Sequence, residues 1–176
     1  MRVWDPLVRV LHWSLATSVI LAFVTHEGPE IVHNSAGYAA LAIAVIRVGW
    51  GFAGGEYARF VNFVASPRAT LSYARAVAAR RERHFVGHNP LGALMIVALL
   101  ASVLVASGTG WMLDTDTWFG DDLIERIHSF FGNLFVPLVF LHVGGVVYTS
   151  VRQKENLVMA MITGRKRKPD EPGKLV

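Results

Sequence analysis

Four long apolar runs constrain this chain more than any other feature of its sequence. They cover about residues 7–25, 33–54, 89–113 and 124–151. Each run approaches or exceeds the roughly 20 residues that a helix needs to cross about 30 Å of hydrocarbon. Backbone polar groups must be satisfied internally in lipid, so such runs fold as helices. The sequence therefore predicts an all-α membrane protein, built as a four-transmembrane-helix bundle.

Composition agrees with a membrane location. The 176 residues are 53% hydrophobic and 17% charged, whereas soluble domains carry about 25% charged residues. The first run does not resemble a cleaved signal peptide, because Arg9 and His12 interrupt it and no small-residue cleavage site follows. We therefore expect it to be the first membrane span.

Charged residues are distributed unevenly among the connections. The connections 26–32 and 114–126 together hold seven acidic residues and one basic residue, Arg126. Fifteen Lys and Arg residues lie instead in the N-terminal segment, the connection 55–88 and the C-terminal segment. Basic residues gather on the cytoplasmic side of membrane proteins. We therefore expect both termini and the connection 55–88 to be cytoplasmic, which gives an N-in and C-in topology.

The basic segments themselves are expected to lie against membrane lipid. The connection 55–88 predicts two short amphipathic helices broken at Pro67, and residues 164–176 form a basic cytoplasmic tail. Anionic lipid attracts such segments. The isoelectric point near 9.8 follows from this charge asymmetry, so the sequence gives no reason to expect nucleic-acid binding.

The chain has no cysteine and seven histidines. This excludes disulfides, iron–sulfur clusters and covalent haem attachment. His128 and His142 lie fourteen residues apart in the fourth run. On a helix this spacing gives a rise of about 21 Å and returns to within about 40° of the same direction, although Pro137 lies between the two residues. Both imidazoles should therefore face the bundle interior.

Two further histidines lie at matching depths in the membrane. His12 and His142 are expected near the cytoplasmic ends of their runs. His33 and His128 lie near the beginning of theirs, on the expected outer side. A single histidine inside a span is a hydrogen-bonding partner between helices about as often as it is a functional residue. Ionisable residues at such depths nevertheless invite a functional hypothesis. Two pairs at two levels favour a cofactor site at each level.

Haem suits such pairs, because imidazole is a good axial iron ligand and a porphyrin needs an apolar slot. Two histidines fill both axial positions, so the iron transfers electrons and does not bind substrate. Gly37 and Gly132, each about one turn after an outer histidine, would let a flat macrocycle approach the backbone; close helix packing is the alternative reason for them. A zinc site or a metal transporter is less expected, because the sequence has no H-E-x-x-H motif and no acidic residue in the interior of the spans; Glu125 lies at the very start of the fourth run.

Four segments together resemble one known family. They are VWDPLVRVLHW from Val3, HNSAGYAALAIAVIRVGW from His33, GHNPLGALM from Gly87 and IHSFFGNLFVPLVFLH from Ile127. In combination they are similar to the bacterial cytochrome b561 family, which includes the b-type cytochrome subunits of nickel–iron hydrogenases. The resemblance implies a domain over residues 1–163 in the bacterial inner membrane that holds two non-covalent b haems.

The resemblance also implies how the ligands pair. It assigns His12 and His142 to the inner haem, and His33 and His128 to the outer haem. His26 stays open as an alternative outer ligand.

Further residues are expected beside the inner haem. The resemblance implies that His88, in the GHNP motif, contacts a propionate or a haem ligand. Arg9 lies one turn before His12, and Arg47 lies near the inner end of the second span. Both are candidates to pair with propionates, with snorkelling toward lipid headgroups as the alternative. His84 is expected to be a loop residue.

These features predict an electron-transfer cytochrome of the respiratory chain rather than a stand-alone enzyme, with no catalytic residues of its own. It would pass electrons between membrane quinone and a periplasmic cytochrome or redox-enzyme subunit, which the acidic connection 114–126 could dock. The alternatives are a superoxide:quinone oxidoreductase and a membrane-anchor cytochrome subunit of a hydrogenase-like complex.

Overall fold

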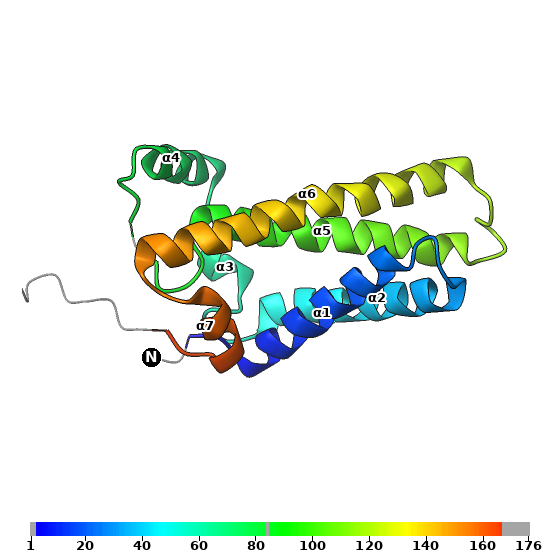
Figure 1. Ribbon diagram of the computed structural model, residues 1–176, viewed down its shortest axis with the longest axis horizontal. Coiled ribbons are helices and arrows are strands. Elements are labelled where there is room, and N and C mark those ends of the chain that lie inside the picture. The colour runs from blue at the N-terminus through cyan, green and yellow to red at the C-terminus, as the bar shows by residue number, and fades with distance from the viewer. Residues whose placement is uncertain (1–2, 84, 167–176) are drawn as a thin grey trace, which may run out of the picture.

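The structure is a computed structural model that describes residues 3–83 and 85–166. This part of the chain folds into helices without any strand (Figure 1). The helices are α1 (Pro6–Val24), α2 (Glu30–Ala53), α3 (Phe60–Phe63), α4 (Pro67–Ala78), α5 (Pro90–Leu113), α6 (Asp122–Gln153) and α7 (Leu157–Thr163). His84 and residues 167–176 of the predicted basic tail lie outside the described residues.

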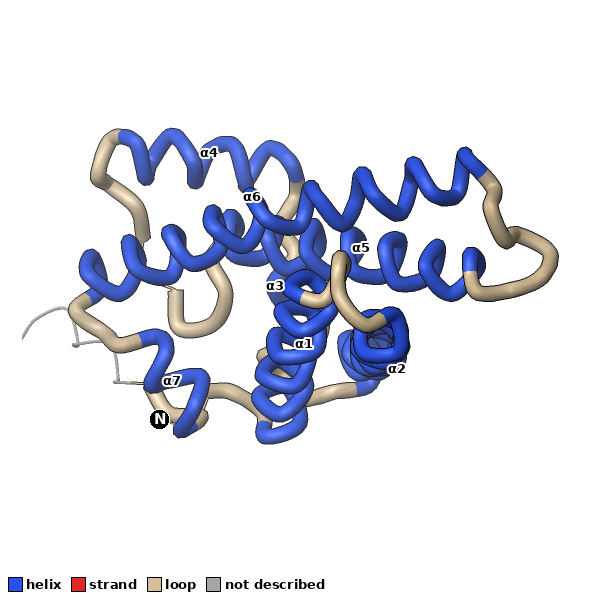
Figure 2. The backbone as a smooth tube through the Cα atoms, turned by 45° about the vertical axis from the view of Figure 1, so that its right-hand side comes forward, coloured by secondary structure: helices blue, strands red, loops and turns tan. Residues whose placement is uncertain are grey.

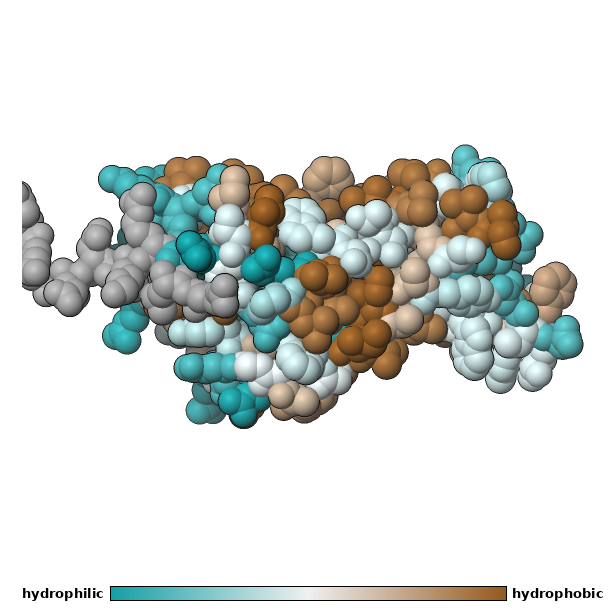
Figure 3. Space-filling model, turned by 90° about the horizontal axis from the view of Figure 1, so that it is seen from below, coloured by the Kyte–Doolittle hydropathy of each residue, from teal (hydrophilic) through white to brown (hydrophobic). Residues whose placement is uncertain are grey.

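Four of these helices, α1, α2, α5 and α6, are long and apolar enough to cross a membrane. They match the four predicted spans and confirm the prediction of an all-α multi-pass membrane protein. On one face, apolar side chains gather over the middle of the molecule and hydrophilic ones lie toward both ends (Figure 3). This distribution is the one that a bilayer requires of a spanning bundle.

The sequence places a cap at the start of three of these helices. The Asp5 carboxylate accepts a hydrogen bond from the backbone N–H of Leu7 at 2.8 Å, and Asp121 does the same for Leu123 at 2.9 Å. The Asn89 side chain caps α5. Such caps satisfy N–H groups that have no partner inside the helix. Helix α6 begins and ends slightly beyond the predicted run; it is 32 residues long and continues through Pro137.

The long helices pack in the order α1 on α2, α2 on α5, and α5 on α6. Ala40 and Ala44 of α2 are buried against Leu100 and Val103 of α5. Small residues at this seam let the two helices approach closely, which is how membrane helices gain packing energy. The histidine side chains described below come from α1, α2 and α6.

The two ends of the bundle differ (Figures 1 and 2). At one end, here called the terminal end, α3, α4 and α7 lie with both ends of the described chain, and the N–H groups of Val3 and Trp4 donate to the Gly164 carbonyl at 2.9 and 3.2 Å. At the other, here called the acidic end, lie the connections 25–29 and 114–121. The structure therefore puts both ends of the described chain on one side of the bundle; which side of the membrane this is stays a prediction.

The connection between α2 and α5 contains two short helices, α3 and α4, as expected, but Pro67 does not interrupt them. It is the first residue of α4, with Ser66 as the cap. Proline suits this position because it lacks the N–H that would have no partner there. The break between the two helices lies instead at residues 64–66. Their predicted place on the membrane surface stays a prediction.

Candidate functional site

His33 of α2 and His128 of α6 face each other near the acidic end, and are here called the acidic-end pair. Their ring centroids are 6.1 Å apart, with the rings inclined at 78°. The His33 Nδ1 lies 2.8 Å from the Ala22 carbonyl oxygen, and the His128 Nδ1 lies 2.8 Å from that of Ala106. A carbonyl only accepts, so each Nδ1 carries the proton and each Nε2 keeps a lone pair for a ligand.

A cavity of about 390 Å³ surrounds this pair. Gly37 and Gly132 line it, and a Cβ atom added to either glycine would meet no other atom within 4 Å. The absent side chains therefore leave open space beside the two imidazoles. The lining also includes Phe135 and Val103, which give the cavity an apolar wall of the kind that a flat aromatic ligand needs.

Gly110 of α5 also belongs to this site, and sequence reasoning missed it. A Cβ atom at this position would lie 3.0 Å from Cε1 and 3.2 Å from Nδ1 of His128. The glycine thus lets α5 approach the imidazole closely enough for the Ala106 carbonyl to accept its hydrogen bond. The small-residue stretch SGTG at the end of the third run is the signal that could have indicated this close approach.

His26 lies at the mouth of the same cavity but is oriented differently. Its Nδ1 lies 2.7 Å from the Phe23 carbonyl oxygen, and its ring stacks on the Phe23 ring with 5.6 Å between centroids. Its side chain is 58% exposed and lies 3.9 Å from the carboxylate of Glu27. In this arrangement His33, and not His26, is the histidine of this end that faces His128.

Polar side chains join α2 to α5 at the same mouth. The Tyr38 hydroxyl donates a short hydrogen bond to the Asp114 carboxylate, and the Asn34 amide donates to both carboxylate oxygens at 3.2 and 3.3 Å. Asn34 and Tyr38 line the cavity. This network fixes the end of α5 against the first turns of α2.

His12 of α1 and His142 of α6 form the second pair, here called the terminal-end pair. Their ring centroids are 6.3 Å apart, with the rings inclined at 48°. The Trp13 ring meets the His12 ring edge-on at 5.1 Å. The His12 Nδ1 is buried and has no hydrogen-bond partner in the described structure. The two pairs sit at successive depths along α6, as the fourteen-residue spacing predicted.

Buried side-chain nitrogen atoms without hydrogen-bond partners gather near the terminal-end pair. The Arg9 Nε, one NH group of Arg47 and the His88 Nδ1 are buried and make no hydrogen bond within residues 3–83 and 85–166. Arg47 is 7% exposed, and its other NH₂ group donates to the Ala58 carbonyl at 3.3 Å. Buried donors cost free energy unless they are paired. This end of the bundle therefore suits ligands that accept hydrogen bonds or carry negative charge.

His88 lies between two aromatic rings, with its centroid 4.6 Å from those of Trp4 and Phe63. Burial, and next the positive charge of Arg47, lower the pKa of His88 to about 3, so its imidazole is neutral at pH 7. Lys166, which sequence reasoning also missed, is 6% exposed and lies over the Trp4 ring at 5.4 Å. Burial lowers the pKa of Lys166. Trp4, Phe63, His88 and Lys166 therefore pack together at the terminal end.

The described residues contain no group of three or more His, Cys, Asp or Glu side chains that could hold a metal ion.

Comparison with known proteins identifies the chain's relatives. Residues 3–164 match the family described as prokaryotic cytochrome b561. A probable Ni/Fe-hydrogenase B-type cytochrome subunit from Rhizobium leguminosarum bv. viciae is 21% identical, over 93% of this chain and 87% of the relative. A protein of the same description from Bradyrhizobium diazoefficiens is 22% identical, over 94% of this chain and 85% of the relative. No solved structure matches the chain significantly. The family match spans most of the chain, which therefore belongs to the prokaryotic cytochrome b561 family and is a membrane-spanning electron-transfer cytochrome of the b type.

Proposed function

We propose that this protein holds two b haems, one at each histidine pair, and transfers electrons between membrane quinone and a redox partner outside the membrane. The terminal-end pair would bind the inner haem and the acidic-end pair the outer haem. The observation that carries the proposal is the matched geometry of the two pairs on opposite helices of the bundle.

The ring separations support one iron per pair. Two imidazoles that share a metal ion through bonds of about 2 Å have ring centroids about 6 Å apart. The observed separations are 6.1 Å at the acidic end and 6.3 Å at the terminal end. Packed aromatic rings also have centroids about 4.5–7 Å apart, so the support comes from histidine pairs that have this separation at both depths.

The hydrogen bonds of the acidic-end pair support the same role. Histidine ligands usually donate their second ring N–H to a carbonyl or carboxylate, which fixes the tautomer and the ring direction. His33 and His128 each do so through Nδ1. The open space at Gly37 and Gly132 supplies room for the macrocycle, which favours His33 over His26 as the ligand.

At the terminal end, the chain's own residues suit the propionate groups of a haem. Arg9 lies one turn from His12, and its buried Nε has no partner in the described structure. We assign Arg9 to a propionate, because a charge-assisted hydrogen bond would pair a donor that is otherwise costly to bury.

A bound haem supplies one-electron transfer at each pair. The chain's own residues would do the rest: two histidines would hold the iron of each haem, so that no substrate would bind it, and the apolar helices would exclude water. The two levels lie about 21 Å apart along α6, so electrons would cross much of the membrane's thickness inside one chain.

The proposed redox partner and the proposed orientation in the membrane rest on the distribution of charged residues and on the names of the relatives. Because the relatives are named as hydrogenase cytochrome subunits, we propose a redox-enzyme subunit or cytochrome as the partner. The acidic connection 114–126 offers it a negatively charged surface. We place the terminal end in the cytoplasm of a bacterial inner membrane, following the distribution of basic residues.

Proteoliposomes loaded with ubiquinol test this function. With ferricyanide outside as an impermeant oxidant, the protein should oxidise the quinol at a rate that falls to the protein-free level in a His33→Ala variant, while His26→Ala retains activity. Quinol oxidation that is unchanged in His33→Ala would contradict the proposal. Rapid haem reduction by superoxide with none by ubiquinol would favour the superoxide:quinone oxidoreductase alternative.

A further inference from the structure

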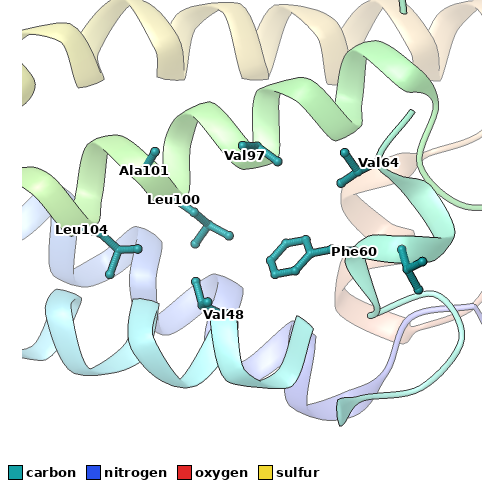
Figure 4. Close-up of a pocket in the computed structure, with 8 residues that line it drawn as sticks. Val48, Phe60, Val64, Val97, Leu100, Ala101 and Leu104 are labelled. Atoms are coloured by element: carbon teal, nitrogen blue, oxygen red, sulfur yellow. The ribbon is translucent and has the colours of Figure 1, made fainter. Parts of the chain in front are cut away.

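A groove lined only by apolar side chains lies where α3 meets α2 and α5. Its volume is about 570 Å³. Val48 of α2, Phe60 of α3 and Ala101 of α5 are among the residues that line it (Figure 4). It shares no lining residue with the cavity around His33 and His128. The groove is therefore separate from the cavity at the acidic-end pair, and its lining suits hydrocarbon.

The groove opens toward the surrounding lipid. Val61 of α3 is 82% exposed, and Val64 and Val97 are 47% and 40% exposed. Phe60 lies deeper, because its ring points between α2 and α5 (Figure 4) and packs so closely on Gly51 that a Cβ atom there would overlap it. Phe60 therefore closes the groove toward the terminal end. A hydrocarbon chain would enter over the two exposed valines of α3.

The depth of the groove matches the acyl chains of one leaflet. Helix α5 begins with Pro90, and its lining residues extend as far as Leu104, fourteen residues further along the helix. At 1.5 Å per residue, the lining reaches about 21 Å from the start of α5. Half of the hydrocarbon core of a bilayer is about 15 Å thick. The groove thus extends from the terminal end to about the middle of the membrane.

Two arginines flank the end of the groove at α3. Arg59 directly precedes Phe60, and Arg68 follows Val64 by four residues. Both side chains are exposed, and neither makes an ion pair within the described ranges 3–83 and 85–166. The backbone of Arg59 lies within about 7 Å of that of Val61, because only two residues separate them. The entrance of the groove is therefore apolar with unpaired positive charge beside it.

We propose that the groove binds an acyl chain of one anionic phospholipid, such as phosphatidylglycerol, and that Arg59 and Arg68 bind its phosphate. The phosphate would lie at the membrane surface, outside the groove, where basic side chains attract anionic headgroups. This proposal goes beyond the general attraction expected for the basic segments, because it places one lipid at one site. It does not depend on the proposed route of the electrons.

An anionic lipid accounts for the combination better than a protein partner does. We place the terminal end in the cytoplasm, and the cytoplasmic ends of membrane helices carry Lys and Arg. A helix of a partner, or a second copy of this chain, would therefore bring like charge toward Arg59 and Arg68. A neutral lipid could fill the groove with hydrocarbon, but it would leave both arginines without a counter-charge.

Native mass spectrometry of the whole protein with phosphatidylglycerol or phosphatidylcholine tests the charged part of the site. We expect one phosphatidylglycerol to stay bound per chain, on the order of tenfold more tightly than phosphatidylcholine. Arg59→Gln and Arg68→Gln should each weaken its binding about fivefold, and the double variant about 30-fold. Equal binding of the two lipids by the wild type would overturn the proposal.

Arg165→Gln is the charge-matched control. Arg165 is an exposed residue at the terminal end that follows α7, and α7 contributes no residue to the groove. This variant removes the same charge as Arg59→Gln does, but away from the groove, so it should bind phosphatidylglycerol as the wild type does. If it weakened binding as much as Arg59→Gln, the attraction would belong to the whole terminal end, and the proposed site would be wrong.

Ala101→Phe tests the hydrocarbon part of the site. Ala101 is an exposed residue of α5 that lines the groove, so a phenyl ring would displace part of the acyl chain. Loss of two buried methylene groups weakens binding about tenfold, and we expect at least this loss. Ala42→Phe is the matched control, because Ala42 is exposed on α2 and lines neither cavity.

A phosphatidylglycerol with a photoreactive diazirine in its acyl chain locates the bound lipid. It should label peptides of α3 and α5 in the wild type and in Ala42→Phe, and this labelling should be lost in Ala101→Phe. Labelling that persists in Ala101→Phe would overturn the proposal. A protein dimer that Ala101→Phe dissociates, without any bound lipid in the wild type, would also overturn it, because a second copy would then occupy the groove.

Val61→Gln guards against a folding defect in Ala101→Phe. Val61 is 82% exposed, so a polar side chain there should leave the fold intact and weaken lipid binding by putting an amide at the entrance of the groove. The b-type absorbance per chain should equal that of the wild type in Val61→Gln and in both arginine variants. Lipid binding by Val61→Gln as tight as that of the wild type would contradict entry of the acyl chain over α3.

Discussion

His33 and His128 face each other with their ring centroids 6.1 Å apart, and each is held through Nδ1 by a carbonyl of the neighbouring helix. The Ala22 carbonyl of α1 holds His33 of α2, and the Ala106 carbonyl of α5 holds His128 of α6. All four spanning helices thus contribute to one site. The packing of α1 on α2 and of α5 on α6 therefore also determines the direction of the two imidazoles.

Gly110→Val should remove the outer haem. A Cβ atom at this position already lies 3.0 Å from the His128 ring, and the added methyl groups would push the imidazole away from the Ala106 carbonyl. The b-type absorbance per chain should fall by about half. Gly108→Val is the control, because a Cβ there meets nothing within 4 Å. Equal haem content in both variants would mean that the close approach of α5 does not position the ligand.

Filling the cavity beside the acidic-end pair should also remove the outer haem. Gly37→Leu and Gly132→Leu project side chains into the space beside the acidic-end pair, so each should block the outer haem and leave the inner one. Gly49→Leu, on an exposed part of α2 away from both cavities, should retain both haems. Pyridine haemochrome titration against protein measures the difference, and full haem content in the two cavity variants would show that no macrocycle occupies this space.

Arg9→Met should lower the midpoint potential of the inner haem. Removal of a nearby positive charge stabilises the ferric form, which carries one more positive charge than the ferrous form. A shift on the order of 60 mV corresponds to a tenfold change in the one-electron equilibrium. Potentiometric titration measures it, with Arg75→Met on the exposed face of α4 as the control. An unchanged potential in Arg9→Met would remove Arg9 from the propionate site.

The ion pair between Glu82 and Arg152 should contribute pH-dependent stability. The Arg152 Nε donates to the Glu82 carboxylate at 2.8 Å, and this hydrogen bond lowers the pKa of Glu82. A carboxylate whose pKa is lowered by folding stabilises the folded state above its ordinary pKa of about 4.3, and the contribution is lost as the pH falls through the lowered value.

The Glu82→Gln variant measures this contribution. Its Tm should lie below that of the wild type at pH 7, and the two values should converge below about pH 4. Glu56→Gln, at an exposed residue of the same connection, is the control. If the difference in Tm between the wild type and Glu82→Gln stayed constant into the acid range, the Glu82–Arg152 ion pair would not be its cause.

Much of this architecture could be predicted from the sequence, because its signals are local. Hydropathy alone located α1, α2, α5 and α6 to within a few residues. The fourteen-residue spacing of His128 and His142 placed both on one face of α6, and the structure brings each beside the expected partner; their role as ligands stays a prediction.

The features that were missed depend on how distant segments dock. The contact of Gly110 with His128 requires the rotation of α5 against α6. The position of Lys166 over Trp4 requires the hydrogen bonds that join Gly164 to the N-terminal segment. The groove closed by Phe60 requires α3 to fold back onto Gly51. No periodicity in one sequence reports these contacts. The misplaced break at Pro67 arose differently, from treating proline as a helix breaker where it begins a helix.

Haem content and redox titration of single histidine variants test the central claim most directly. The wild type should hold two b haems per chain with two midpoint potentials. His33→Ala and His128→Ala should lose one of these potentials, and His12→Ala and His142→Ala should lose the other. A single haem per chain, or loss of the same potential in His12→Ala and His33→Ala, would contradict the assignment of one haem to each histidine pair.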